Sequence, residues 1–184
     1  MRVEVYTSTG RASGRVGDAG DGDLRDLLAT EAQLLLTDVT WEGLGDRPRP
    51  AATRSFAVDD IVFALAADEL DTPVHAAWHH VVLHAGPYVL EGDLATMPGF
   101  DPGRSLARPS GDFVLLRDVR VALVELPDSA IAVGDRALVN RYVVEQIQAD
   151  MMLAFFFPGA VTATESLTTT TAGRGTGEAV GGLV

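Results

Sequence analysis

Two residue types are missing from this chain of 184 residues: cysteine and lysine. Without cysteine the chain can form no disulfide, thiolate zinc site, cysteine nucleophile or iron–sulfur cluster. Without lysine it can have no P-loop, no Schiff base and no pyridoxal site. Neither a Gly-x-Ser-x-Gly elbow nor a dinucleotide fingerprint is present. We therefore predict no catalytic residue and no cofactor.

Positive charge is scarce. All 14 basic residues are arginines, and 26 acidic residues give a net charge of -12. Such a surface repels phosphate backbones and anionic lipids, so we predict no binding to nucleic acid or to membranes. The longest apolar run, Met151 to Ala163, is interrupted by Pro158 and is too short to span a bilayer, which needs about 20 residues. The N-terminus lacks the apolar stretch of a signal peptide, so we expect a soluble, cytoplasmic protein.

The two halves of the chain carry the same features in the same order. Residues 2–16 align with residues 80–94 without a gap, and Leu-Ala at 28–29 aligns with Leu-Ala at 106–107. Two further alignments follow, of LLLTDV at 34–39 with VLLRDV at 114–119 and of residues 58–62 with residues 139–143. This ordered set of features predicts an internal duplication.

Strand patterns dominate both halves. Val3 and Val5 alternate with polar residues and are expected to face inward, with Tyr6 facing outward. Gly14 and Gly92 lie inside the second strand of each half, where a missing side chain permits the bend that a small barrel needs. Longer or later strands are expected at 34–41, 56–66, 113–126 and 137–147.

One short helix is expected at residues 23–30. Asp23 can cap it, and Leu24, Leu27 and Leu28 form one apolar face. Loops are expected at 17–23, 43–53 and 126–130. These elements divide the chain into a first β unit (1–66), a connector (67–78), a second β unit (79–150), an apolar segment (151–163) and a flexible tail (164–184).

The succession of GRASGRV, LLLTDV and FAVDDIVFAL resembles Sm-like units. Such units run strand, bent strand with glycine, loop, strand ending in an acidic residue, and short final strand. The chain also resembles an uncharacterised bacterial family of small β proteins of unknown function, here in tandem duplicate. The resemblance covers about residues 1–66 and 79–150. It implies a mainly β fold with little helix: two tandem small β-barrel units, Sm-like or SH3-like, with a pseudo-twofold relation.

The residues that bind RNA in Sm-like proteins have no match in this chain. Those proteins carry an Asp/Asn pair before the third strand and Arg-Gly or Lys-Gly in the last hairpin. Here the first place holds the sequence LRDLLAT, and the second holds Asp59-Asp60 in one half and Asn140-Arg141 in the other. The resemblance therefore implies the fold and not RNA binding.

The polar clusters of the chain predict no metal site. His75, His79, His80 and His84 fall in one stretch. Because 80–84 is expected to be strand, two histidines at this spacing lie about 13 Å apart, too far for one ion. The aspartates of residues 17–23 miss the spacing of a calcium loop. Asp38 and Asp118 hold equivalent positions, and we expect them to accept backbone N–H bonds rather than to form a catalytic pair.

Candidate interaction residues lie near the end of the chain. Three consecutive phenylalanines at 155–157 cannot all face one small core; either they divide between a core and a groove, or they form a surface for a partner or a second copy. The tail is expected to be mobile, and residues 179–184 are a candidate docking peptide, with a frayed terminus as the alternative. The candidate residues are Met151, Met152, Phe155, Phe156, Phe157, Leu183 and Val184.

Two functions remain open. The first is a non-enzymatic structural or protein-interaction module that binds a protein partner or associates with itself, which includes a homo-oligomer. The second is a small-ligand-binding or enzymatic protein with a site between the two β units. A pocket between the units, lined by convergent polar groups, would favour the second function.

Overall fold

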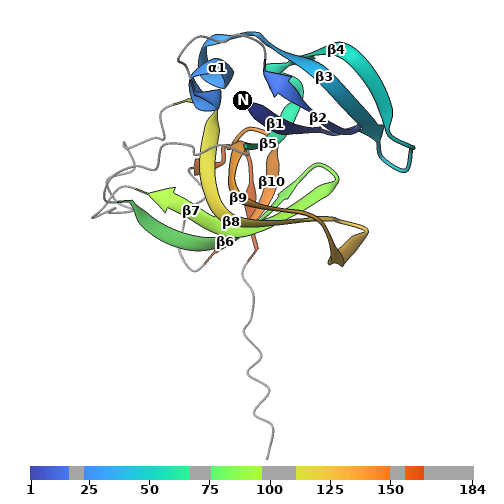
Figure 1. The fold of residues 1–184 in the computed structure, drawn as a ribbon. Helices are drawn as coiled ribbons and strands as arrows, with labels where there is room; N and C mark the ends of the chain where they lie inside the picture. The colour runs from blue at the N-terminus through green and yellow to red at the C-terminus, as the bar shows by residue number, and fades with distance from the viewer. Residues whose placement is uncertain (17–22, 67–75, 97–110, 150–155, 164–184) are drawn as a thin grey trace, which may run out of the picture.

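The computed structural model describes residues 1–16, 23–66, 76–96, 111–149 and 156–163. Within these ranges the chain is mainly β, with one α-helix and eleven strands in one sheet (Figure 1). The first half contains β1 (Arg2–Thr7), β2 (Gly10–Val16), α1 (Leu24–Thr30), β3 (Gln33–Gly43), β4 (Arg49–Ala57), the 3-10 turn η1 (Val58–Asp60) and β5 (Ile61–Ala66). The second half contains β6 (Ala77–Ala85), β7 (Tyr88–Thr96), β8 (Phe113–Leu123), β9 (Leu126–Asn140), β10 (Val144–Ala149) and β11 (Val161–Thr162).

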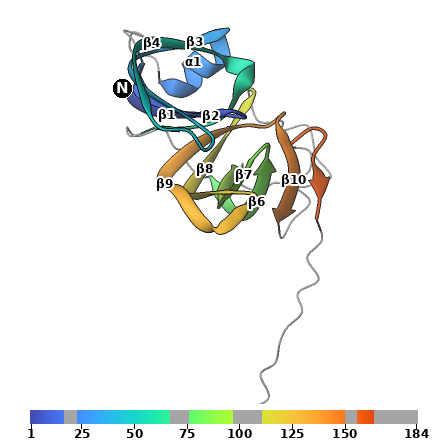
Figure 2. The ribbon, with the colours of Figure 1, turned by 90° about the vertical axis from the view of Figure 1, so that its right-hand side faces the viewer.

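The two halves have the same strand order. The sheet runs β11-β10-β6-β7-β8-β9-β5-β1-β2-β3-β4. In each half the fifth strand therefore lies beside the first, and the second, third and fourth follow in sequence. Figure 2 shows the two halves as separate lobes, with β1 to β4 and α1 in one and β6 to β10 in the other. Identical strand order is what the predicted duplication requires.

The halves join where β9 pairs with β5. This antiparallel contact places Val139 opposite Phe63, Leu138 opposite Ala64 and Ala137 opposite Leu65. The contact is head to tail, because it joins the fourth strand of one half to the fifth strand of the other. The expected pseudo-twofold relation between the two units stays a prediction.

The hydrophobic interior consists of two clusters, and the strands at this joint contribute side chains to both of them. Ile61 and Ala64 of β5 belong to the cluster of the first half, whereas Val62, Phe63 and Leu65 belong to that of the second. Both faces of β5 are thus covered, which explains its continuous apolar sequence IVFALA. The first residues of β8 and the last of β9 are shared between the clusters in the same way. The two lobes form one packed body.

The helix prediction is confirmed. Asp23 caps α1, and its side chain accepts a hydrogen bond of 2.9 Å from the backbone N–H of Asp26. Leu24 and Leu28 are buried in the first cluster, as the spacing of the apolar residues indicates. Of the predicted loop at 17–23, residues 17–22 lie outside the described residues.

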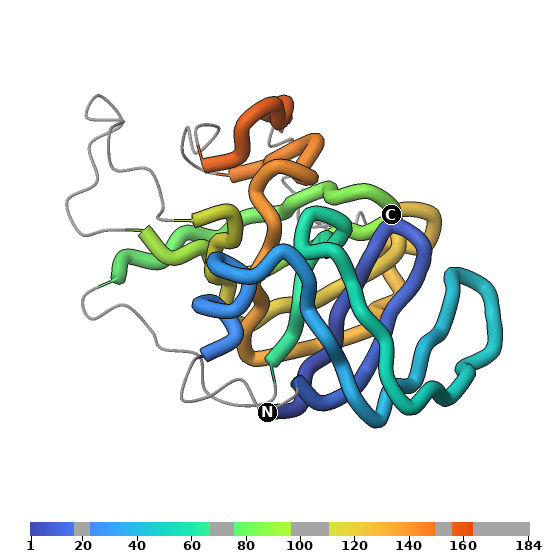
Figure 3. The backbone as a smooth tube through the Cα atoms, turned by 90° about the horizontal axis from the view of Figure 1, so that it is seen from above, coloured from blue at the N-terminus to red at the C-terminus, as the bar shows by residue number. Residues whose placement is uncertain are grey.

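Two strand predictions and two loop predictions are wrong. The expected strand 56–66 contains the end of β4, the turn η1 and all of β5. The expected strand 137–147 contains the end of β9, a short turn and the start of β10. Residues 49–53, expected in a loop, belong to β4, and residues 126–130 belong to β9. Figure 3 shows the β3–β4 hairpin, light blue to cyan, projecting at one side of the molecule. These polar segments are strands because they pair with β3 and β8, and not because of their own pattern.

Strand pairing also corrects the alignment of the fifth strands. Thr7 of β1 pairs with Ile61, and Ala85 of β6 pairs with Val144. Because residue 7 aligns with residue 85, Ile61 corresponds to Val144. The sequence alignment of 58–62 with 139–143 was therefore out of register by two residues.

Candidate functional site

The candidate interaction residues divide between the interior and the parts of the chain outside the described residues. Phe156 and Phe157 are buried in the cluster of the second half, with 4% and 0% of their surfaces exposed. They are covered by the protein itself and do not form an exposed patch. Met151, Met152, Phe155, Leu183 and Val184 lie outside the described residues, as do residues 150 and 164–184, so their interaction role stays a prediction.

His79 and His80 each have polar partners of their own. His80 is in β6 as predicted, and its two ring nitrogens lie 3.6 Å from Glu91 and 3.5 Å from Asp93 across the sheet. The Nε2 atom of His79 lies 3.0 Å from the hydroxyl of Thr96. Among the described residues, no group of three or more His, Asp or Glu side chains is arranged to hold a metal ion. His75 lies outside those residues.

Asp38 and Asp118 share a backbone conformation rather than a site. They lie on β3 and β8, in different lobes. The carboxylate of Asp118 lies 3.6 Å from Nε of Arg117, and 77% of its side chain is exposed. Neither feature resembles a buried catalytic pair.

An aromatic cluster fastens the two lobes together. The ring of Tyr6 stacks on Phe63 at 4.2 Å, and the ring of Tyr88, from the second half, stands edge-on to both. The Tyr88 hydroxyl donates a 2.9 Å hydrogen bond to the backbone oxygen of Thr7 and lies 3.4 Å from that of Gly10. Tyr6, expected to face outward, is fully buried because the second half covers it.

A hollow of about 260 Å³ opens beside this cluster, between the two lobes. The first half supplies a polar wall, with Arg11 and Glu42, and the tip of the β3–β4 hairpin, with the half-exposed Leu44. The second half supplies an apolar wall of Leu123 and Ile131. The two tyrosines, Tyr6 and Tyr88, also line it.

Arg11 and Tyr6, which line this hollow, each bind a carboxylate. Glu42 accepts 2.8 Å bonds from Nε and Nη2 of Arg11, and the Tyr6 hydroxyl donates a 2.8 Å bond to Glu4. The hydrogen bond to Glu42 raises the pKa of the Arg11 guanidinium. Burial raises the pKa of the Tyr6 phenol, and the bond to Glu4 raises it further. Burial also raises the pKa of Tyr88, to about 12. Both phenols therefore stay neutral at physiological pH.

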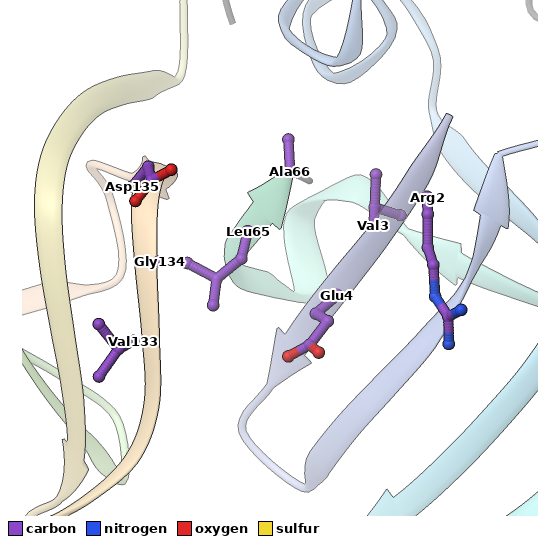
Figure 4. A pocket seen from close by; sticks show the side chains of 8 residues that line it. All are labelled: Arg2, Val3, Glu4, Leu65, Ala66, Val133, Gly134 and Asp135. Atoms are coloured by element: carbon purple, nitrogen blue, oxygen red, sulfur yellow. The ribbon is translucent and has the colours of Figure 1, made fainter. Parts of the chain in front are cut away.

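A second hollow, of about 340 Å³, lies across the joint itself. Figure 4 shows it where β5 ends between β1 and β9. Glu4 and Asp135 bring carboxylates to it, and Arg2 brings a guanidinium. It is lined by Arg2, Val3, Glu4, Leu65, Ala66, Val133, Gly134 and Asp135. Glu4 thus borders this hollow while it binds the tyrosine that lines the other.

The strands near the two ends of the sheet are less completely covered than the strands at the central joint. β4 is the last strand at one end, and eight of its nine residues are exposed. At the other end β10 is covered in part by the two-residue strand β11, which runs parallel to it. Edge strands present unpaired N–H and C=O groups that can pair with another strand. The apolar strand β5 is therefore buried at the joint, whereas β4 at the end of the sheet is exposed.

Comparison with protein-family models, with curated proteins and with solved structures found no match to this chain. Within the described part of the chain, no helix has both the length and the apolar character needed to cross a membrane. The site must therefore be judged on its own geometry.

Proposed function

We propose that this protein is a non-enzymatic structural and interaction module, built from two equivalent Sm-like β-barrel units, that joins copies of itself edge to edge. The observation that carries the proposal is the β9–β5 joint. At this joint the fourth strand of one half pairs with the fifth strand of the other half, within a single chain. The same two edges recur as β4, at one end of the sheet, and as β10, which is followed by the two-residue strand β11 at the other end.

The pairing of the strands predicts the register of such a contact. In β10, Gln146, Ile147 and Gln148 correspond to Phe63, Ala64 and Leu65 of β5, since their partners on β6 and β1 align. By the same argument from β3 and β8, the residues of β4 that correspond to Val139, Leu138 and Ala137 are Phe56, Ser55 and Arg54. The contact between copies would therefore set Arg54 opposite Gln148 and Phe56 opposite Gln146.

The predicted contact is more polar than the internal joint. Arg54, Ser55 and two glutamines replace residues that are almost all buried and apolar at the joint. Backbone hydrogen bonds would supply most of its stability, because little apolar surface is removed from water. We therefore expect a reversible association and not a permanent fusion of units.

The absence of cysteine permits a direct test. In antiparallel strands, directly opposite Cα atoms lie about 4.5–5.5 Å apart, which suits a disulfide. We expect a chain carrying Arg54→Cys and Gln148→Cys to form disulfide-linked multimers under mild oxidation, since within one chain these positions lie toward opposite ends of the sheet. The control pair Ser55→Cys and Gln148→Cys shifts the register by one residue, which turns the two side chains to opposite faces.

Because β11 lies on β10, the cross-linking is carried out both in the native background and with Ala163→Pro, which removes a hydrogen bond that holds β11. Multimers of the first pair, without multimers of the control pair, in either background support the proposed assembly. Monomers of the first pair in both backgrounds contradict it. Light scattering after size-exclusion chromatography gives the mass of the native chain.

A second function is favoured by the hollow between the lobes. Arg11, with 42% of its side chain exposed, lines this hollow together with the apolar side chains Leu44, Leu123 and Ile131. This combination suits a small amphipathic anion, with its charge on Arg11 and its apolar part on the opposite wall. Titration with phenylacetate, followed by calorimetry, tests this function. Binding that is lost in Arg11→Gln supports it, and no binding to the native chain contradicts it.

A further inference from the structure

The short strand β11 lies on the sheet at a particular place. Val161 and Thr162 pair in parallel with Gln146 and Ile147 of β10. The backbone N–H of Ala163 donates a 3.0 Å hydrogen bond to the carbonyl of Ile147. Thus β11 occupies the edge of β10 that faces away from β6.

That place is the counterpart of the joint between the lobes. Gln146 and Ile147 correspond to Phe63 and Ala64, the two residues of β5 that pair with Val139 and Leu138 of β9. In the first half this stretch of edge therefore binds a fourth strand, and in the second half it binds β11. One edge can pair with only one strand at a time, since each N–H and C=O group along it is used once.

We propose that β11 is an internal cap that competes with the β4 strand of a second copy for the edge of β10. This inference rests on the proposed edge-to-edge assembly and adds its control. The chain carries its own competitor, so two units are joined permanently while further joining requires β11 to leave. Covering an edge in this way is a recognised means of preventing unwanted pairing.

The cap is weakly held. β11 has two residues, against three paired positions at the internal joint, and 68% of the Val161 surface is exposed. Its pairing is parallel, which is slightly less stable per residue than antiparallel pairing. An incoming antiparallel β4 can therefore replace it at the cost of few contacts.

The residues before β11 hold it nearby. Phe156 and Phe157 are buried in the second cluster, and the chain then turns at Gly159, where φ is 89°. The N–H of Ala160 closes this turn with a 3.1 Å bond to the carbonyl of Phe157. The phenylalanines thus anchor the segment while β11 itself can detach and return. This gives the buried Phe156 and Phe157 a role in holding the cap.

The test compares three full-length chains that carry the Arg54→Cys and Gln148→Cys pair: the otherwise native chain, Ala163→Pro and Ala163→Gly. Proline removes the N–H that bonds to Ile147, whereas glycine keeps it. We expect the cross-linked fraction at low conversion to rise about fivefold in the proline variant, which is the effect of losing one backbone hydrogen bond. The glycine variant is expected to behave as the native chain does. Hydrogen exchange is expected to show faster exchange of the β10 amides in unoxidised Ala163→Pro.

If the native and proline chains cross-link equally while the control pair does not cross-link, the role of β11 as a cap is contradicted but the edge-to-edge assembly is still supported. Cross-linking in none of the three contradicts the assembly and the competition together. A rise in the glycine variant equal to that in the proline variant also overturns the cap, because the bond to Ile147 would then be irrelevant. An unchanged melting temperature shows that each variant is folded.

Discussion

Asp38 and Asp118 hold the same position in the two lobes and share the same backbone conformation, with φ of 49° and 51°. They are the two non-glycine residues of the described chain with a positive φ. In each half, two residues of the third strand lie opposite one glycine of the second strand, and the aspartate is the first of those two, so it belongs to a β-bulge. Aspartate tolerates this left-handed conformation better than most side chains do. The two halves therefore carry the same local feature at the same place in their third strands.

Replacing Asp118 tests this conformational role. We expect Asp118→Gly to keep or raise the free energy of unfolding, because glycine adopts a positive φ without strain. Asp118→Val is expected to lower it by about 1–2 kcal/mol, the cost of a left-handed backbone for an ordinary side chain. Urea unfolding followed by circular dichroism measures both. The control is Asp128→Val, on an exposed position of β9, expected within about 0.5 kcal/mol of the native value. Equal losses at 118 and 128 would contradict the conformational role.

The glycines opposite these bulges allow a second test. A Cβ atom at Gly92 would lie 2.8 Å from the carbonyl oxygen of Arg117, and one at Gly14 would lie 3.0 Å from that of Thr37. Because backbone atoms cannot move aside cheaply, we expect both alanine variants to lose roughly 1–3 kcal/mol, with the larger loss at Gly92.

Gly134→Ala is the control for this pair of variants. Its Cβ would meet the flexible side chain of Leu65 at 3.2 Å, which can adjust. We expect its loss in urea unfolding to be smaller than that of either bulge glycine. A loss at Gly134 larger than at Gly92 would show that close backbone approach is not what selects glycine at the bulges.

Much of the fold could be predicted from local patterns. The alternation of β1, the glycine in the second strand of each half and the Asp23 cap of α1 are local features, and the structure places them as expected. The strand-forming tendency of β4 and of the start of β9 could not be read, because their polar sequences become strands only by pairing with β3 and β8. The head-to-tail joint likewise depends on contacts between the halves.

The aromatic cluster and the hollow between the lobes could not be predicted from the sequence. Tyr6 looks like the outer member of an alternating strand, and nothing nearby in the sequence indicates that Tyr88, 78–81 residues from its partners, will cover it. One signal was available: the unbroken apolar run of β5 is typical of a strand buried on both faces. It could have placed β5 at a joint, although not against a particular partner.

Tyr88 is expected to contribute measurably to the joint through its hydroxyl group. Tyr88→Phe keeps the ring contacts with Tyr6 and Phe63 but removes the hydrogen bond to the carbonyl of Thr7. We expect a loss of about 0.5–1.5 kcal/mol in the free energy of unfolding. The control is Tyr142→Phe, because Tyr142 is 58% exposed and its change is expected to stay within about 0.5 kcal/mol. Equal effects of the two variants would contradict a specific role for the Tyr88 hydroxyl.

The two buried tyrosines predict that stability falls in alkaline solution. Their pKa values are raised in the folded protein, that of Tyr88 to about 12 from an ordinary 10. Below pH 10 both phenols are neutral in the folded and the unfolded chain, and their contribution to stability is fully present. Above pH 10 the unfolded chain loses these protons while the folded chain keeps them, so the contribution is lost as the pH rises through the folded pKa.

We therefore expect the free energy of unfolding to fall between pH 10 and 12 by up to about 1.4 kcal/mol per pH unit for each of the two tyrosines. Urea unfolding at pH 8, 10 and 11 measures the slope. Tyr88→Phe removes one titrating group from the joint and should make the slope shallower, and the double variant with Tyr6→Phe should make it shallower still. The variants also lose hydrogen bonds, and this loss lowers the free energy of unfolding at pH 8 as well, where neither phenol titrates. Comparing the slopes, rather than the stabilities at one pH, therefore separates the effect of titration from that of the lost hydrogen bonds. A double variant whose stability falls as steeply as that of the native chain would show that the alkaline loss arises elsewhere than in these two phenols.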